Sequence, residues 1–398
     1  MYISKIGARN FKSFDNLKVE LGKFNVLVGS NASGKSNFVD LIKFIKNLTI
    51  YGLEDAFQMM GGIEFVQNLE IGKQNPVEVF FTLDEVDVKV NFFDTMININ
   101  KVKYNLGVKS GKKMKISKDE MNLYLSKGKN KFKLKLFKEK EKLKYEVTGT
   151  DSEIKEKLEN SVEDVLKPFS KVFSKEPIIR SLIAVPPPPI LAHSIGVYNF
   201  EPKDMKCAVR IGGKAELEEN GGNLPIILQK ALSSKNMRDN ILYLLKDFIP
   251  FVEKVNIEKF IDKSAFLSLK EEFYRRSIPA SLISEGTLNI LATIVALIYE
   301  NKSIYVFEEP ERNIHPTLIE KLVNMIKDFS RKKQIILTTH NPLIVKYSGI
   351  DHILLVKRDK NGFSHIVKPK NSAIVNDFLR SDFGLDELFV KDIIGAGI

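Results

Sequence analysis

The pattern of apolar and polar residues is most regular at the two ends of the chain. The apolar segment from Phe24 to Val28 predicts a strand, and the helical spacing of apolar residues from Phe38 to Leu48 predicts a helix directly after it. The C-terminal part alternates in the same way. It predicts strands at Ser303–Phe307, Gln334–Leu337 and Ile353–Val356, and helices at 287–299 and 318–329. Strands that alternate with helices are typical of a parallel α/β sheet.

The middle of the chain, roughly 90–280, is irregular by comparison. Lysines alternate with apolar residues from Lys131 to Leu136 and again from Lys142 to Val147. This alternation predicts a β-hairpin with one apolar face and one lysine face. A charged helix is predicted over 153–173, and the proline run Pro186–Pro189 predicts a stiff extended connector.

These patterns divide the chain into three parts. Residues 1–90 are expected to form an N-terminal lobe, residues 91–280 a large α+β insertion with lysine-rich hairpins and helices, and residues 281–398 a C-terminal lobe.

Composition favours an intracellular protein that does not enter a membrane. The chain has 398 residues, is 43% hydrophobic, and contains Cys207 as its one cysteine, so it cannot form an internal disulfide. The N-terminus lacks the apolar region of a signal peptide. The longest apolar run, Ile290–Tyr299, is much shorter than the roughly 20 residues of a membrane span. We therefore expect a cytoplasmic location.

The positive charge is concentrated in one segment. The whole chain has a net charge of +11, and residues 101–150 alone contain 16 lysines, no arginine and five acids. This segment therefore accounts for the entire excess. Lysine-rich strands can neutralise nucleic-acid phosphates, so contact with DNA through residues 101–150 is one interpretation. The alternative is that the lysines solvate a sheet face and protect an edge strand from aggregation.

A phosphate-binding loop follows the first predicted strand. Residues Gly29–Ser36 match the pattern G-x-x-x-x-G-K-[ST], between an apolar strand and an amphipathic helix. Backbone N–H groups of such a loop bind phosphate oxygens, the lysine reaches the β- and γ-phosphates, and the serine hydroxyl is a ligand of Mg²⁺. The sequence thus predicts ATP with Mg²⁺ as the bound species. The predicted binding residues are Asn31, Ala32, Ser33, Gly34, Lys35, Ser36 and Asn37.

Two later strands end in candidate catalytic residues. Glu308 and Glu309 follow one strand, and His340 follows the next. Glu308 is suited to hold Mg²⁺, Glu309 to polarise the attacking water, and His340 to contact the γ-phosphate. Each has a simpler interpretation when taken alone, since many buried strands end in exposed acids and a histidine can cap a helix or pack in a core. The phosphate loop favours the catalytic interpretation.

The order and identity of these motifs resemble the ABC-type ATPases of the RecF/SMC/OLD (overcoming lysogenization defect) group. The stretches that carry the resemblance are Ile6–Phe14, similar to an N-terminal "NFKSF" strand, Val28–Asn37, similar to Walker A, Leu282–Thr287 at the position of the signature, Glu308–Pro316, similar to Walker B and the D-loop, and Thr338–Pro342, similar to the switch-histidine motif. The resemblance implies an α/β fold, a P-loop NTPase of ABC-head type with a mixed sheet built from both lobes, and it implies that the protein hydrolyses ATP.

In such ATPases two domains close around two ATP molecules. The resemblance implies that Ser284 and Gly286 of one chain would contact the γ-phosphate held by a second copy, so a homodimer is expected. The signature departs from the transporter sequence, and Glu308 stands where aspartate is more usual. Gln67 and Gln74 are two candidates for the Q-loop glutamine, and the sequence leaves the choice open.

The interval between motifs separates the subgroups. The phosphate loop ends at Ser36 and the signature begins at Ser284, which is longer than in transporter ATPases and too irregular for an SMC coiled coil. It fits a globular insertion, as in OLD-like and RecF-like proteins. Because only about 58 residues follow His340, we expect neither the TOPRIM domain of OLD proteins nor an intrinsic nuclease activity. We expect an ATP-driven dimer that acts in DNA repair or phage defence. The alternative is a nucleotide-dependent switch that recruits a separately encoded nuclease or other effector without contacting DNA.

Overall fold

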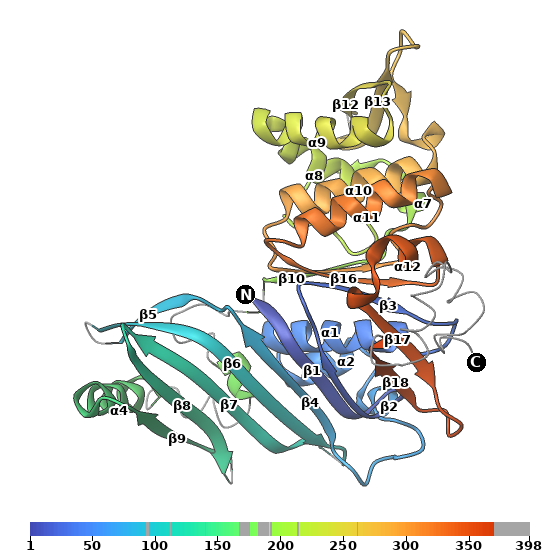
Figure 1. Cartoon of the computed structure of the whole chain (residues 1–398). Coiled ribbons are helices and arrows are strands. Elements are labelled where there is room, and N and C mark those ends of the chain that lie inside the picture. The colour runs from blue at the N-terminus through green and yellow to red at the C-terminus, as the bar shows by residue number, and fades with distance from the viewer. Residues whose placement is uncertain are drawn as a thin grey trace.

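A computed structural model describes residues 1–92, 95–111, 113–139, 141–166, 176–181, 191, 193–212, 215–260 and 262–369. Three β-sheets, named A, B and C, organise these residues (Figure 1). Sheet B lies at the centre, sheet A extends from it to the left of the view, and sheet C lies beyond a layer of helices at the top. The predicted connector Pro186–Pro189 lies outside the described residues.

Sheet B is the predicted sheet of strands that alternate with helices. Five of its strands are parallel, and the sixth, β18, is added antiparallel at one edge. Every residue of β3, β10 and β16 is buried, as expected for parallel strands that are covered on both faces. In spatial order the strands are β10 (Ile195–Tyr198), β15 (Ile304–Glu308), β16 (Gln334–Thr339), β3 (Phe24–Val28), β17 (Ile353–Arg358) and β18 (Ser364–Val367).

Two hydrophobic cores cover the two faces of sheet B. Successive residues of a strand point to opposite faces. Leu27 therefore packs with α1 (Lys35–Ile50) and sheet A, whereas Val26 and Val28 pack with the helices on the other face. These helices are α8 (Leu224–Ser233), α9 (Lys235–Phe248), α10 (Glu285–Tyr299), α11 (Pro316–Phe329) and α12 (Pro342–Ser348). The parallel sheet is thus covered by an apolar layer on each of its two faces.

Sheet A is antiparallel and contains the predicted lysine-rich hairpin. Its main path runs in the order β2, β1, β4, β6, β7, β8, β9, with β5 paired to β6. The hairpin is confirmed, because β8 and β9 pair antiparallel and Phe132, Leu134 and Leu136 are buried while the lysines between them are not. The strands are β1 (Tyr2–Phe11), β2 (Phe14–Glu20), β4 (Val77–Asp84), β5 (Val88–Phe92), β6 (Thr95–Lys109), β7 (Lys115–Lys127), β8 (Asn130–Glu139) and β9 (Lys142–Gly149).

The expected boundary between residues 90 and 91 falls inside a strand of sheet A. It lies within β5, and β4 on one side of it pairs with β6 on the other. The lysine-rich strands therefore continue the N-terminal sheet. A strand pattern shows which face is buried, but it does not show which distant strand is the neighbour.

Smaller elements connect the sheets. Sheet C pairs β11, β13 and β12, with β14 added to β13, and it packs on α8 and α9.

Within the described residues, none of the helices combines the length and the hydropathy needed to span a bilayer. Helix α4 covers part of the predicted 153–173 helix, and residues 167–173 lie outside the described part. The remaining elements are α2 (Leu53–Gln58), α3 (Ile63–Val66), α4 (Ser152–Leu166), α6 (Ile178–Ser181), α7 (Pro202–Met205), β11 (Val209–Arg210), β12 (Val252–Lys259), β13 (Ser264–Glu271), β14 (Ile278–Pro279), and the 3-10 turns η2 (Ala280–Leu282) and η3 (Ile350–His352).

Candidate active site

The predicted phosphate loop connects β3 to the N-terminus of α1. Gly34 is the residue before the helix and has φ +115, and Ala32 is left-handed at φ 62. Gly34 has no side chain that could cap the helix, and none of the described residues accepts a hydrogen bond from the N–H groups of Lys35, Ser36 or Asn37. Together with the helix dipole, these N–H groups form a site for an anion. Ser36 is exposed in the first turn, where its hydroxyl can be reached from solvent.

Two glycines of the loop are required by their surroundings. A Cβ at Gly34 would lie 2.3 Å from Ser364 Oγ, and one at Gly29 would lie 2.3 Å from the carbonyl oxygen of Val356. The Ser364 hydroxyl also donates a hydrogen bond of 2.6 Å to the carbonyl oxygen of Ser33. The loop is therefore held against β17 and β18, and this contact fixes its curvature.

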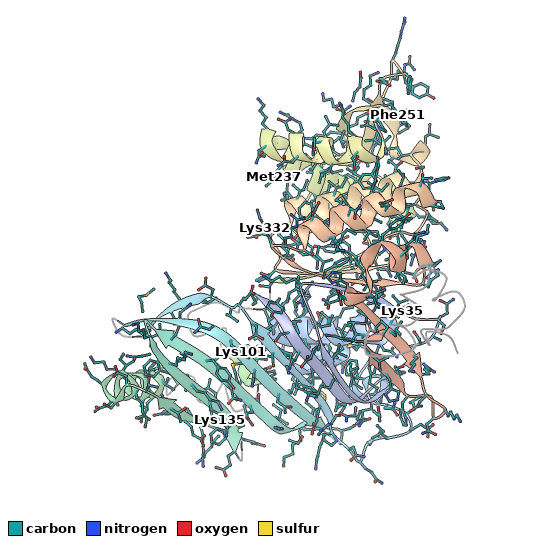
Figure 2. All side chains as sticks on the ribbon, in the orientation of Figure 1. Lys35, Lys101, Lys135, Met237, Phe251 and Lys332 are labelled. Atoms are coloured by element: carbon teal, nitrogen blue, oxygen red, sulfur yellow. The ribbon has the colours of Figure 1, made fainter. Side chains whose placement is uncertain are left out.

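Lys35 is folded onto its own loop. Its Nζ donates hydrogen bonds to the carbonyl oxygens of Gly29 (2.7 Å) and Ser30 (2.9 Å), and the residue is 7% exposed. Burial lowers the pKa of Lys35, and the nearby carboxylates of Glu309 and Glu311 oppose that shift. The ammonium group thus lies beside the helix N-terminus and within the field of the acidic residues. Figure 2 labels Lys35 on the right-hand side of sheet B.

The strand order of sheet B brings the predicted catalytic residues to this loop. Strand β16 lies between β15 and β3, and all three are parallel. Glu308 is in register with Thr338, and Thr339 is in register with Val28, so the three strands end at the same edge. Residues that follow parallel strands meet at the carboxyl edge of a sheet, which is where such folds bind ligands. Glu309, His340 and the phosphate loop are brought together in this way.

Glu309 forms a close pair with His340. Glu309 Oε1 lies 2.7 Å from His340 Nδ1, and Glu309 Oε2 lies 3.5 Å from an Arg312 guanidinium nitrogen. The backbone of Glu309 has φ 45, and its N–H donates to the carbonyl oxygen of Thr338 at 2.9 Å. A positive φ is uncommon for glutamate, and such backbone strain is concentrated at functional sites. The carboxylate remains partly open to solvent, with 24% of the side chain exposed.

Glu308 is held by a lysine from α1. Its Oε1 lies 3.3 Å from Lys43 Nζ, and Lys43 also pairs with Glu219. Burial raises the pKa of Glu308, and Lys43 opposes the shift. Among the described residues, no hydrogen bond joins Glu308 to the Ser36 hydroxyl. Ser36 belongs to the loop, whereas Glu308 ends β15 at the same edge of sheet B and has a cationic partner, Lys43, that the sequence pattern did not reveal.

Glu311 is a buried acid that the sequence pattern did not single out. Its carboxylate accepts a hydrogen bond from the Thr339 hydroxyl, which in turn accepts one of 2.9 Å from the N–H of Asn341. Burial raises the pKa of Glu311 to about 7, and the other carboxylate oxygen has no hydrogen-bond partner in the described structure. The sequence does show that Glu311 is a third acid close to Glu308 and Glu309. It does not show which of the three acids is buried.

The predicted signature forms the N-terminus of α10. Ser284 caps the helix by accepting a hydrogen bond of 3.2 Å from the N–H of Thr287. A Cβ on Gly286 would lie 2.3 Å from the carbonyl oxygen of Asn313, and the Asn313 amide donates to Glu285 Oε2 at 2.7 Å. The signature is therefore packed against the segment that follows Glu309. Ser284 itself is exposed.

The N-terminal turn between β1 and β2 contacts the first turns of α1. The Asn37 amide donates to Ser13 Oγ at 2.7 Å, and Lys12 pairs with Asp40.

Of the two Q-loop candidates, Gln67 is 5% exposed and its amide nitrogen has no hydrogen-bond partner in the described structure. Gln74 is exposed.

Two protein-family models match the chain. Residues 1–179 match the family described as "AAA ATPase domain", and residues 208–346 match the family described as "AAA domain, putative AbiEii toxin, Type IV TA system". The first match contains the phosphate loop, and the second contains the signature, the acidic strand end and His340. The chromosome partition protein Smc of Methanocaldococcus jannaschii is 48% identical over 48 residues, a match that covers 12% of this chain and 4% of that protein.

Solved structures of SMC head domains are similar over nearly the whole chain. An SMC head bound to the C-winged helix domain of ScpA has a TM-score of 0.53 at 14% identity, and the match covers 92% of this chain and 98% of that chain. For an SMC head with an extended coiled coil from Pyrococcus furiosus, the TM-score is 0.48 at 14% identity, with 96% and 100% covered. The similarity to the first of these structures confirms the predicted fold class, a P-loop NTPase of ABC-head type. The two family matches support an ATPase.

Proposed function

We propose that the chain hydrolyses ATP at the phosphate loop, with Glu309 as the general base. The observation that carries this proposal is the 2.7 Å pair between Glu309 and His340 at the same sheet edge as the loop. The Glu309 carboxylate accepts a proton from water as the water oxygen bonds to the γ-phosphorus. The bond between the γ-phosphorus and the bridging oxygen breaks, and ADP and inorganic phosphate leave. His340 orients Glu309 and contacts the γ-phosphate.

The residues around the loop fit a triphosphate with Mg²⁺. The uncapped N-terminus of α1 and the positive φ of Gly34 provide the anion site, and Lys35 provides a cation beside it. Ser36 and Glu308 would hold the metal, which when bound neutralises charge on the β- and γ-phosphates. Asn31 and Ala32 would supply backbone N–H groups, and the N–H of Ser33, which donates to the carbonyl oxygen of Ser30 at 3.3 Å, would exchange that bond for one to phosphate. Gln67 is the stronger Q-loop candidate, because its buried amide lacks a partner among the described residues.

A second copy of the chain completes the site in this proposal. Within the described structure, Ser284 bonds to Thr287 and Gly286 packs on Asn313, and no hydrogen bond joins either one to the phosphate loop. Ser284 is exposed and therefore available to another molecule, whereas Gly286 is buried at the start of the helix. A two-fold dimer in which each signature faces the partner's phosphate loop satisfies both surfaces at once.

The binding step is tested by a Lys35→Ala variant. Titration with Mg²⁺ and a fluorescent ATP analogue should give saturable binding to the wild type and none to the variant. Lys332→Ala is a suitable control, because Lys332 is exposed and in Figure 2 lies to the left of the helical layer, whereas Lys35 lies to the right of sheet B. Equal affinity of the wild type and Lys35→Ala would remove the basis of the proposal.

For the biological role, we propose an OLD-like ATPase that contacts DNA in repair or phage defence. Lysines of neighbouring strands share the outer face of sheet A: the Tyr124 ring lies 5.2 Å from Lys103 Nζ and 5.9 Å from Lys133 Nζ, and Lys135 lies beside Asn122 on the adjacent strand. Lys101 and Lys135 are marked on this sheet in Figure 2. Part of this charge is offset, since Lys101 pairs with Asp84.

A gel shift of duplex DNA at several salt concentrations tests this contact. Lys103→Ala combined with Lys133→Ala should weaken binding and reduce the dependence of log K on log salt by about two, one for each lost phosphate contact. Lys332→Ala again serves as the control. An absence of DNA binding by the wild type at low salt with ATP present would contradict this role.

The alternative function is a nucleotide-dependent switch for a separate effector, such as a nuclease. It is favoured by an apolar hollow of about 530 Å³ on the helical layer, which includes the exposed Tyr243 with Leu244, Leu297 and Phe329. The description of one matching family names a toxin–antitoxin system, which supports a protein that works together with a separate partner in defence. Co-purification of a specific effector that is lost in Tyr243→Asp, without loss of ATP hydrolysis, would favour this function over DNA contact.

A further inference from the structure

The loop that follows β10 lies beside both acidic residues of the candidate site. Strand β10 pairs in parallel with β15, and Tyr198 is in register with Phe307, so residues after Tyr198 emerge next to Glu308 and Glu309. Two stretches of it, residues 199–201 and 218–220, border a polar hollow of about 380 Å³. The hollow is lined by Asn199, Glu201, Glu218, Glu219 and Asn220.

Two cations connect this loop to the two site carboxylates. Arg312 contacts Glu201 at 3.1 Å through one guanidinium nitrogen and Glu309 at 3.5 Å through the other. Lys43 contacts Glu308 at 3.3 Å and also pairs with Glu219. Each site acid is therefore linked, through one cation, to a different acid of the same loop.

The loop itself is held in one shape by its backbone. The N–H of Asn199 donates to the carbonyl oxygen of Glu219 at 2.8 Å, and the N–H of Glu201 donates to that of Asn220 at 2.9 Å. The Asn220 amide donates to Asp204 at 2.6 Å. Glu201 and Glu219 therefore keep a fixed spacing, and the cations that they bind are held relative to β15.

We propose that Glu201, acting through Arg312, is a positioning residue that orients the Glu309 carboxylate. The proposal rests on the proposed function, because it assigns to Glu309 the role of base. With Oε1 beside His340 and Oε2 beside Arg312, the carboxylate has contacts on both oxygens, and its plane is set by groups on two different segments. A base held in this way meets the attacking water in one geometry, and small displacements of a reacting group reduce rates steeply.

The ion pair itself contributes little to folding. Arg312 and Glu201 keep 36% and 49% of their side chains exposed, and pairs in such positions stabilise proteins only weakly. Variants at these positions should therefore fold normally, so that a loss of turnover reports on positioning. Arg331 offers a matched control, because it forms a similar i,i+3 pair with Asp328 at 3.0 Å and is exposed.

The test is a double-mutant cycle on ATP turnover with Arg312→Gln, Glu201→Gln and the combined variant. Arg312→Gln should lower kcat by about tenfold or more, while KM and the Kd for ATP stay within about twofold of the wild type. Arg312→Lys should recover part of the rate. The combined variant should be no slower than Arg312→Gln, because Glu201 acts only through Arg312. Arg331→Gln should turn over at the wild-type rate.

Two outcomes would overturn the inference. One is a kcat of Arg312→Gln within about twofold of the wild type, and the other is a combined variant in which the two single effects multiply. Both are separable from a failure of the proposed function. If Lys35→Ala abolishes turnover while Arg312→Gln does not change it, the ATPase assignment stands and only the positioning role is lost.

Discussion

His340 Nδ1 lies 2.7 Å from Glu309 Oε1, although 31 positions separate the two residues in the chain. The contact exists because β15 and β16 are parallel neighbours that end at the same edge. The same strand order places β3 and the phosphate loop beside His340. Three short motifs that are far apart in sequence thus form one site.

Replacing His340 by alanine should slow hydrolysis without removing ATP binding. The imidazole is a hydrogen-bond partner of the base and a neighbour of the phosphate loop, and groups of this kind typically contribute about 10²–10³ in kcat. Single-turnover phosphate release and a separate binding titration would measure the two effects. His193→Ala is the control, because His193 is an exposed histidine that lies 3.6 Å from a glutamate. Wild-type kcat in His340→Ala would contradict the role of the pair.

Gly34→Ala should abolish ATP binding by disturbing the loop. A Cβ at this position would meet Ser364 Oγ at 2.3 Å, and the left-handed φ adds a cost of about 1 kcal/mol or more. Gly362→Ala is the matched control, because Gly362 also has a positive φ but nothing lies within 4 Å of the place that its Cβ would take. Nucleotide titration of both variants measures the difference. Wild-type affinity in Gly34→Ala would contradict the predicted collision with Ser364.

Glu311 should make folding stability depend on pH. Its pKa is about 7 in the folded chain and close to the ordinary glutamate value of 4.5 when unfolded. Because the folded state then holds the proton more tightly, the contribution of Glu311 to the free energy of unfolding is present below pH 4.5 and is lost as the pH rises to about 7. The loss is on the order of 3 kcal/mol. Urea unfolding of the wild type and Glu311→Gln at pH 5, 6, 7 and 8 measures it.

The comparison of slopes decides this prediction. The free energy of unfolding of Glu311→Gln should fall less between pH 5 and 7 than that of the wild type, because glutamine carries no titrating proton. Parallel pH dependences in the two proteins would show that Glu311 does not titrate in this range.

Lys138→Met should destabilise sheet A strongly. Lys138 Nζ lies 3.1 Å from the fully buried Asp119, which also accepts hydrogen bonds of 2.9 Å from the Tyr104 hydroxyl and the Ile178 N–H. Removing one partner of a buried ion pair typically costs about 3–5 kcal/mol. Lys144→Met removes an exposed pair with Glu139 and should cost less than about 1 kcal/mol. Chemical denaturation compares the two, and similar losses would contradict the buried-pair account.

The sequence predicted the elements of the core and the site better than the relations between distant segments. The strand Phe24–Val28, the helix after it and the lysine-faced hairpin follow from local periodicity, which depends only on neighbouring residues. Lys43 and Arg312 were missed because a lysine on a helix and an arginine in a loop look like ordinary surface charges until their partners are known. Likewise, nothing in the sequence around Ser364 shows that its hydroxyl contacts the phosphate loop.

The most direct test of the central claim is Mg²⁺-dependent phosphate release by wild-type protein, Lys35→Ala and Glu309→Gln, measured in parallel with ATP binding and with molecular mass in solution. The wild type should release phosphate, Lys35→Ala should neither bind nor release, and Glu309→Gln should bind ATP, release no phosphate and accumulate as a dimer. Phosphate release by Glu309→Gln at the wild-type rate would contradict the assignment of this carboxylate as the base.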